Sequence, residues 1–345
     1  MDQERALTWE PPAGWRRLTA IDSHAGGEPF RVVVDGLPEI PGETVLQKRS
    51  YAMANLDDLR RAIMWEPRGH SDMYGGWIGP PVAEESDLSV LFLHNEGFST
   101  MCGHGIIALG KVLIETGMIA ATEPETTIRI DTPAGTVVAI SSVSSGTVSA
   151  TRFRNVPSFV ADLDAIVDVE GFGSVRYDLA FGGAFYAIVA VADVEVSLDD
   201  AAALAEAGRR IKKAITASRE INHPDEPELG FLYGVIFTGP ARSPLHHSRN
   251  VCVFADGEID RSPTGTGVSS RLAVLSARGE IGVDEEVMIE SIVGSTFRGK
   301  IVERSKSGSA TIIPEISGTA HITGRSEFWL DPRDTLGGGF LVAAS

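Results

Sequence analysis

Two short glycine corners hold the residues whose types and spacing point most clearly to chemistry. They are Cys102–Gly105 (CGHG) and Thr264–Gly267 (TGTG), and each one leads into a stretch with helical character. A G-x-G corner at a helix start exposes backbone N–H groups that have no partner within the helix and carry positive partial charge. Such a corner suits a carboxylate or a phosphate, whereas a tight turn without a ligand is the alternative for either corner alone.

The first corner also carries a thiol. Cys102 stands at the head of the expected helix, where the helix dipole favours the thiolate, so we predict a lowered pKa and a role as base or nucleophile. The alternative is a small buried hydrophobic residue. We expect His104 to hydrogen-bond a ligand rather than to pair with Cys102, because neighbouring corner residues rarely face each other. Cys252 lies in the alternating run NVCVFADG and is expected to pack in the core of a strand.

The sequence lacks the motifs of other common kinds of site. No pair of Cys and His residues has zinc spacing, so we expect no metal. Neither corner is a G-x-G-x-x-G or a P-loop, so no nucleotide cofactor is expected. Two cysteines in 345 residues do not make a disulfide framework.

The chain contains an internal repeat. Residues 102–119 match residues 264–281 without a gap, including Gly103 with Gly265 and Gly117 with Gly279, and 26–34 resembles 182–190. Each half predicts short strands, then a glycine corner, then a helix that ends at Gly117 or Gly279, then further strands. Two pseudo-symmetric halves usually place equivalent loops across one cleft, where a small ligand is held between them.

Beyond the repeat, a helix is expected over about 199–218, and its basic run 209–213 is interpreted as a solvated face. The net charge of −17 repels phosphate backbones, so we expect no nucleic-acid partner. The longest apolar run, 179–192, is too short to span a bilayer, and the first residues do not form a secretory signal. A cytoplasmic enzyme that does not act on membranes is the expectation.

The chain resembles the proline racemase family along nearly its whole length, in DSHAGGEPFRVV (22–33), MCGHGIIAL (101–109), GGAFYAIV (182–189), RNVCVFADGEIDRSPTGTG (249–267) and TAHITGRSEFWLDPRD (319–334). The resemblance implies an α+β, diaminopimelate-epimerase-like fold. Its two pseudo-symmetric domains would each be a mainly antiparallel, barrel-like sheet around a central helix, with the active site in the cleft between them. We assign 1–150 to the first domain, completed by 318–345, and 151–317 to the second. A cofactor-independent enzyme that forms a homodimer is implied as well.

The resemblance also predicts the reaction. Racemases and epimerases of the family use two cysteines, one on each face of the substrate α-carbon. The first falls on Cys102, and the second falls on position 264, where this chain has Thr264. A threonine hydroxyl does not ionise near neutral pH, so two-base inversion should be lost while proton abstraction by Cys102 remains. This Cys/Thr pattern implies dehydration of trans-3-hydroxy-L-proline to pyrroline-2-carboxylate, in an amino-acid catabolic role.

The substrate contacts are carried over residue by residue. Four backbone N–H groups would hold the carboxylate, those of Gly103, His104, Gly265 and Thr266. Asp260 and the His104 ring would bind the ring nitrogen. Thr264 would either fill the opposite face of the site or cap the helix that begins at residue 265. Because a 3-hydroxyl trans to the carboxylate lies on the same ring face as the α-hydrogen, elimination would be syn, and protonated Cys102 or a water beside it would protonate the hydroxide.

Two alternatives stay open. A racemase or epimerase of proline or hydroxyproline needs another group in place of the second thiol, and Cys252 is not expected to supply it because it lies twelve residues before position 264. A non-catalytic binder of a proline-type ligand would keep the carboxylate site, but such a protein gains little from the thiol of Cys102.

Overall fold

The repeated sequence folds into two halves that are built in the same strand order. The structure is a computed structural model, and it describes residues 2–305 and 311–342. The elements of the first half are α1 (Gln3–Leu7), β1 (Arg16–Ala25), β2 (Glu28–Asp35), α2 (Val45–Asn55), α3 (Asp57–Met64), β3 (Tyr74–Gly79), β4 (Leu88–His94), β5 (Gly97–Ser99), α4 (Gly103–Glu115), β6 (Glu125–Thr132), β7 (Gly135–Ser144) and β8 (Thr147–Arg154).

The second half continues with β9 (Phe159–Val169), β10 (Gly173–Phe181), β11 (Phe185–Ala190), η1 (Val191–Asp193), α5 (Ala201–Ser218), η2 (Pro227–Leu229), β12 (Leu232–Gly239), β13 (Ser248–Phe254), β14 (Glu258–Ile259), α6 (Gly265–Ala277), β15 (Glu286–Glu290), β16 (Thr296–Arg304), β17 (Ile312–Gly318) and β18 (Ala320–Leu330).

The strand pairings confirm the repeat. In the first half the ladders run β18, β1, β2, β3, β4, β6, β7, β8. In the second half they run β9, β10, β11, β12, β13, β15, β16, β17. The parallel pairs also correspond, β2 with β3 to β11 with β12, and β4 with β6 to β13 with β15. The fold is therefore α+β with two pseudo-symmetric halves, as predicted.

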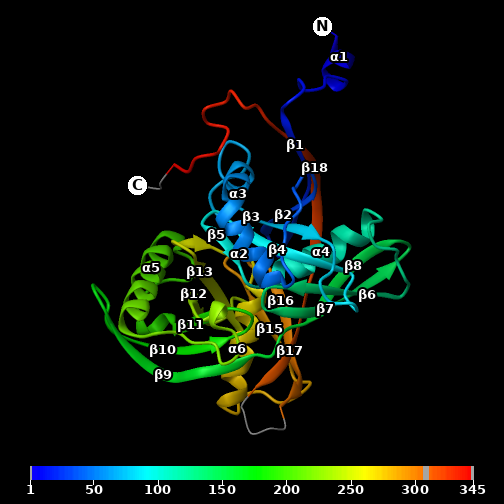
Figure 1. Cartoon of the computed structure of the whole chain (residues 1–345). Helices are drawn as coiled ribbons and strands as arrows, with labels where there is room; N and C mark the ends of the chain where they lie inside the picture. The colour runs from blue at the N-terminus through cyan, green and yellow to red at the C-terminus, as the bar shows by residue number, and fades with distance from the viewer. Residues whose placement is uncertain (1, 306–310, 343–345) are drawn as a thin grey trace.

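The two halves are joined by strands from the end of the chain. β17 pairs with β16 of the second half and with β8 of the first, and β18 pairs along its length with β1. Figure 1 shows β18 continuing from β17 and running up beside β1. The C-terminal strand therefore pairs with the first half of the chain, and β8 extends across residue 150, where the sequence analysis divides the two domains.

One helix lies inside each sheet. α4 packs against β1, β7, β8 and β18, and α6 packs against β9, β10, β16 and β17. Both helices are 13 residues long and are buried on nearly all sides, because their side chains are apolar or small in every direction. Gly117 and Gly279 follow them with φ of +78° and +73°, which confirms the predicted C-terminal stops. The sheets thus hold the two helix starts in fixed positions.

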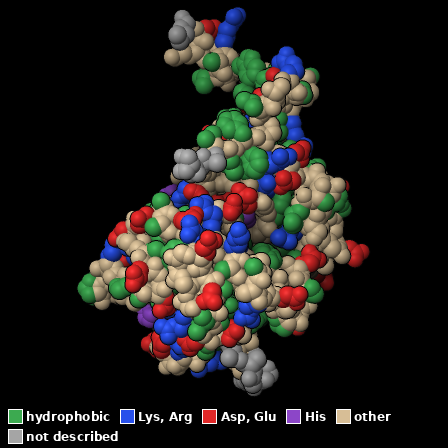
Figure 2. All heavy atoms as spheres, turned by 90° about the vertical axis from the view of Figure 1, so that its left-hand side faces the viewer, with side chains coloured by type: hydrophobic (Ala, Val, Ile, Leu, Met, Phe, Trp, Pro, Cys, Tyr) green, Lys and Arg blue, Asp and Glu red, His purple; other side chains and the backbone are tan. Residues whose placement is uncertain are grey.

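The basic run of α5 lies on the surface. Arg209 and Arg210 are exposed and pair with Glu206, as expected for a solvated face. Lys212 of the same run is instead half-buried and donates a hydrogen bond to the Ala255 carbonyl. Figure 2 shows acidic and basic side chains interspersed over the face that it displays. Among the described residues, no helix is both long and apolar enough to cross a membrane.

Candidate active site

The N-termini of α4 and α6 meet backbone to backbone. A Cβ added to Gly103 would lie 2.6 Å from the Gly265 Cα, and a Cβ added to Gly265 would lie 2.7 Å from the Gly103 Cα. Neither position leaves space for a side chain. The two corner glycines are therefore needed for the halves to approach each other.

A small cavity of about 10 Å³ opens between these helix starts. Its wall includes every residue that the sequence analysis assigned to the site, and six that it did not. The lining residues are Tyr74, Met101, Cys102, Gly103, His104, Tyr186, Tyr233, Cys252, Phe254, Asp260, Thr264, Gly265 and Thr266. A volume close to that of one water probe cannot hold a five-membered ring, so the cavity must widen to admit one.

Cys102 is held at the head of α4. Its Sγ accepts a hydrogen bond from the Gly105 N–H at 3.2 Å and so caps the helix. Burial raises the pKa of the Cys102 thiol well above its ordinary value, although the Gly105 N–H opposes this. The predicted lowering of the pKa is thus wrong for this closed cavity, because loss of water outweighs the helix dipole.

His104 contacts the same sulfur, contrary to prediction. Its Nδ1 lies 3.3 Å and its Nε2 3.5 Å from the Cys102 Sγ, because the first turn of the helix brings both side chains into the cavity. Burial lowers the pKa of His104 to about 4, against the opposing effects of Asp260 and of a hydrogen bond with the Pro29 carbonyl. The ring is therefore neutral near pH 7.

Thr264 occupies the equivalent position in the second half and does not cap its helix. Its Oγ1 donates a hydrogen bond of 2.8 Å to Asp260 Oδ2, and its side chain makes no cap bond to α6. Asp260 Oδ1 accepts from the Ser262 N–H at 2.7 Å. Thr264 also has φ of +66°, a conformation that is strained for a β-branched residue. The capping alternative is wrong, and the hydroxyl is oriented by a buried carboxylate instead.

Cys252 is both a core residue and part of the cavity wall. It lies on β13 and is completely buried, as predicted. Burial raises the pKa of the Cys252 thiol well above its ordinary value, while a hydrogen bond with Thr264 has a smaller opposite effect. Its distance from position 264 in the sequence therefore did not keep it away from the site.

Three of the chain's five tyrosines line the cavity and were missed by sequence reasoning. Tyr74, Tyr186 and Tyr233 lie on β3, β11 and β12, three strands that point into the cavity from both halves. The Tyr186 Oη is 2.6 Å from the Thr266 Oγ1. A signal was available, since a tyrosine in a strand that is otherwise apolar needs a partner for its hydroxyl when it is buried.

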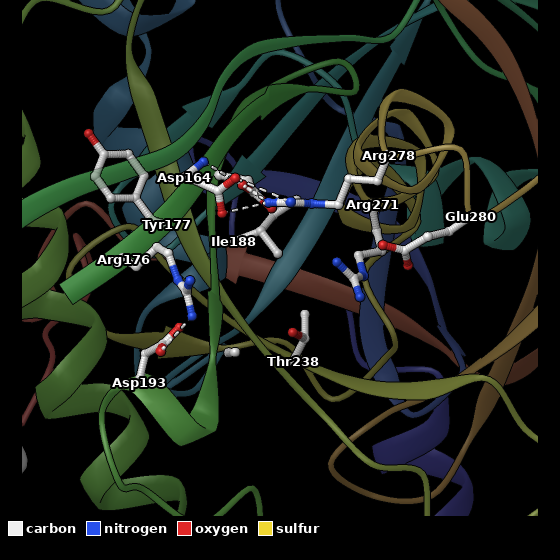
Figure 3. A pocket seen from close by; sticks show the side chains of 11 residues that line it. Asp164, Arg176, Tyr177, Ile188, Asp193, Thr238, Arg271, Arg278 and Glu280 are labelled. Carbon is white, nitrogen blue, oxygen red and sulfur yellow. Dashed lines mark hydrogen bonds and ion pairs between the residues drawn. The ribbon is translucent and has the colours of Figure 1, made fainter.

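A larger cavity lies elsewhere and holds none of the predicted site residues. It has a volume of about 300 Å³ and is lined by charged side chains of β10, α6 and their neighbours. Figure 3 shows Arg278 directed at Asp164 and Arg176 directed at Asp193, so much of this charge is already paired. Size alone therefore does not identify the active site here. In the described part of the chain, no group of three or more His, Cys, Asp or Glu side chains could hold a metal ion.

The site consists of two opposed helix starts around a buried thiol, and it lies between two pseudo-symmetric halves. This arrangement defines an epimerase-like architecture. The chain belongs to the proline racemase family, whose model, described as proline racemase, matches residues 20–341. The family membership predicted from the sequence motifs is thereby confirmed.

Individual relatives carry two kinds of name. A trans-3-hydroxy-L-proline dehydratase from Burkholderia ambifaria is 43% identical over 330 residues, which cover 95% of this chain and 98% of the relative. A 3-hydroxyproline 2-epimerase from Burkholderia multivorans is 42% identical over the same shares. The crystal structure of a hydroxyproline epimerase from Agrobacterium vitis with bound trans-4-hydroxy-L-proline has a TM-score of 0.91 and 33% identity, covering 96% of each chain.

Proposed function

We propose that this protein removes water from trans-3-hydroxy-L-proline to give pyrroline-2-carboxylate. The observation that carries the proposal is the pairing of Cys102 with Thr264 across the cavity, with a thiol at one helix start and a hydroxyl at the other. One strong proton acceptor on one face supports abstraction without inversion. The name of the Burkholderia ambifaria relative supports the same reaction.

The two helix starts would bind the substrate carboxylate. In the described part of the chain, the N–H groups of Gly103, His104, Gly265 and Thr266 donate to no protein acceptor. They lie at the positive ends of two helices that face one cavity, which is the arrangement that binds a carboxylate. This contact leaves the α-carbon between Cys102 and Thr264.

The ring nitrogen would bind at the acidic side of the cavity. Asp260 presents its carboxylate there, and the neutral His104 ring lies beside the Cys102 sulfur. A substrate ammonium next to Cys102 would lower the pKa of the thiol, because an opposite charge favours the thiolate. The thiolate then takes the α-hydrogen, the C2–C3 double bond forms, and the 3-hydroxyl leaves with the C3–O electron pair.

Epimerisation of a hydroxyproline is the second candidate, and Cys252 favours it. This thiol lies in the cavity wall beside Thr264, on the side where a second base would act. The name of the Burkholderia multivorans relative is consistent with this outcome. Against it, the buried Cys252 thiol has a raised pKa, and Thr264 lies next to it.

The deciding experiment follows three substrates in D₂O. L-proline, trans-4-hydroxy-L-proline and trans-3-hydroxy-L-proline are each incubated with the protein, and α-hydrogen exchange, optical rotation and pyrroline formation are recorded. We expect pyrroline from trans-3-hydroxy-L-proline alone, and exchange without inversion from the others. Rapid formation of D-amino acid that disappears in Cys252→Ala would establish the epimerase instead.

Restoring the second thiol tests the same assignment from the other side. In Thr264→Cys, the new thiol lies on the face opposite Cys102, so slow racemisation of L-proline should appear while pyrroline formation persists. Racemisation by the unmodified protein at the same rate would contradict the proposal that Thr264, in place of a second thiol, prevents inversion. A homodimer and a cytoplasmic location, which the family resemblance and the composition suggest, remain parts of the proposal.

A further inference from the structure

A cluster of hydroxyl groups lies directly beside the catalytic thiol. Tyr74 and Cys102 line the same small cavity, and the Tyr74 hydroxyl lies 2.5 Å from the Ser99 Oγ and 3.0 Å from the Tyr233 Oη. Tyr74 is only 3% exposed, and its ring packs edge-on against His104 with centroids 4.8 Å apart. The phenol is thus fixed in position on the Cys102 side of the cavity.

The cluster favours donation by Tyr74. When Tyr74 directs its proton toward the cavity, the hydroxyls of Ser99 and Tyr233 can both donate to its oxygen. Two donors on one oxygen stabilise the negative charge that develops when the phenol gives up its proton. Burial raises the pKa of Tyr74 well above its ordinary value, so the phenol is protonated before the reaction starts.

Other polar groups near Cys102 are less suited to protonate a leaving group. His104 is neutral and already hydrogen-bonded to the Pro29 carbonyl. Asp260 accepts hydrogen bonds from Ser262 and Thr264 and lies on the second half. Glu28 is buried and takes no part in the cavity wall.

We propose that Tyr74 is the catalytic acid that protonates the departing 3-hydroxyl group, an inference that rests on the dehydration proposed above. The α-hydrogen and the trans-3-hydroxyl lie on the same ring face, and Tyr74 lies beside the base that acts on that face. Cys102 thiolate takes the α-hydrogen, the C2–C3 double bond forms and the C3–O bond breaks. Tyr74 gives its proton to the leaving hydroxide, which becomes water, and the Cys102 thiol returns a proton to the phenolate. Protons balance, and the thiolate is regenerated without bulk solvent.

The Tyr74→Phe variant separates the two proton transfers. In D₂O with trans-3-hydroxy-L-proline, we expect pyrroline formation to fall by roughly 100-fold or more, the usual range for loss of a general acid. Exchange of the α-hydrogen of the same substrate should persist within about tenfold of the unmodified rate, because Cys102 remains. The variant should therefore exchange deuterium into unreacted substrate faster than it dehydrates it.

Tyr186→Phe is the matched control, since it removes a buried hydroxyl from the same cavity on the other half. Its ratio of exchange to dehydration should stay as in the unmodified protein. A parallel fall of exchange and dehydration in Tyr74→Phe, or no fall in dehydration, would overturn the role of Tyr74. Absence of pyrroline from the unmodified protein would instead overturn the proposed function, so the two failures can be told apart.

Discussion

The two helix starts share one backbone plan and differ in their chemistry. At the first, Cys102 has an extended backbone with φ of −143°, and its sulfur caps the helix. At the second, Thr264 has φ of +66°, and its hydroxyl turns away from the helix to Asp260. Two residues further on, His104 of the first corner corresponds to Thr266 of the second. The repeat thus supplies two helix N-termini of the kind that suit an anion, and in the proposed reaction single side chains decide which half accepts the proton.

The same comparison holds for the groups around each start. On the side of the first half, the thiol lies beside a neutral histidine and the hydroxyls of Tyr74 and Ser99, to which Tyr233 of the second half adds a third hydroxyl. The second half presents the Asp260 carboxylate, held by Thr264 and the Ser262 N–H. In the proposed reaction, a proton-transfer side and a cation-binding side would therefore face each other across a cavity that both halves line.

The largest expected effect comes from removing the thiol that distinguishes the first start. Cys102→Ser nearly keeps the size of the side chain but replaces the thiol at the start of α4 with a hydroxyl. Both pyrroline formation and α-hydrogen exchange should fall by roughly 10³-fold, the middle of the usual range for a general base. Cys252→Ser, which alters the other buried thiol in the wall, should retain far more activity. Comparable losses in the two variants would contradict the assignment of Cys102.

The next effect tests the difference between His104 and Thr266 through stability. The folded-state pKa of His104 is about 4, below the ordinary 6.5, so between these pH values the unfolded chain binds a proton that the folded protein does not. Stability must fall as the pH drops through this window, by up to about 3 kcal/mol, and not change further below it. Urea unfolding of His104→Gln at pH 7 and pH 4.5 should show a smaller loss than the unmodified protein. Equal losses would mean that His104 titrates normally.

The contact between the two starts should be sensitive to one methyl group on either side. Gly103→Ala and Gly265→Ala would each drive a Cβ into the opposite backbone, at a cost of about 1–3 kcal/mol for an overpacked site. Thermal unfolding should register the loss, and activity should fall because the halves no longer close. Gly97→Ala is the control, since no atom lies within 4 Å of its added Cβ. Full activity in Gly103→Ala would show that close contact of the halves is unnecessary.

The smallest expected effect is a loss of stability at the C-terminal ends of α4 and α6, where the two halves are alike. Gly117 and Gly279 both have positive φ and open space around them, so substitution by alanine costs only backbone strain. Each change should lower stability by about 1 kcal/mol, and by the same amount within error. Denaturant unfolding of the two variants measures this directly. A clear inequality would show that the repeat is less regular at its C-terminal stops than its backbone indicates.

Much of this architecture could be predicted from residues alone. The matching glycines gave the duplication, the helices and their ends, and the family motifs gave the seven site residues that the structure gathers into one cavity. The three cavity tyrosines were not predicted as site residues, because they lie on three strands from two halves. The periodicity of a strand does not indicate which strands lie close together in the fold. Cys252 was predicted to be buried in a strand, but its contact with Thr264 depends on the pairing of β13 with its neighbours.

The sequence by itself determined the repeat, the Cys102 and Thr264 difference, and therefore the expectation of a single strong base, because these depend on residue types at matched positions. Only the tertiary structure decided the state of that base. Burial in a closed cavity outweighs the helix dipole and keeps the thiol protonated, and contact across the helix turn brings His104 to the sulfur. The tertiary structure also places the Tyr74 hydroxyl in the same cavity as Cys102. Desolvation and contact are properties of the packed chain and not of any segment within it.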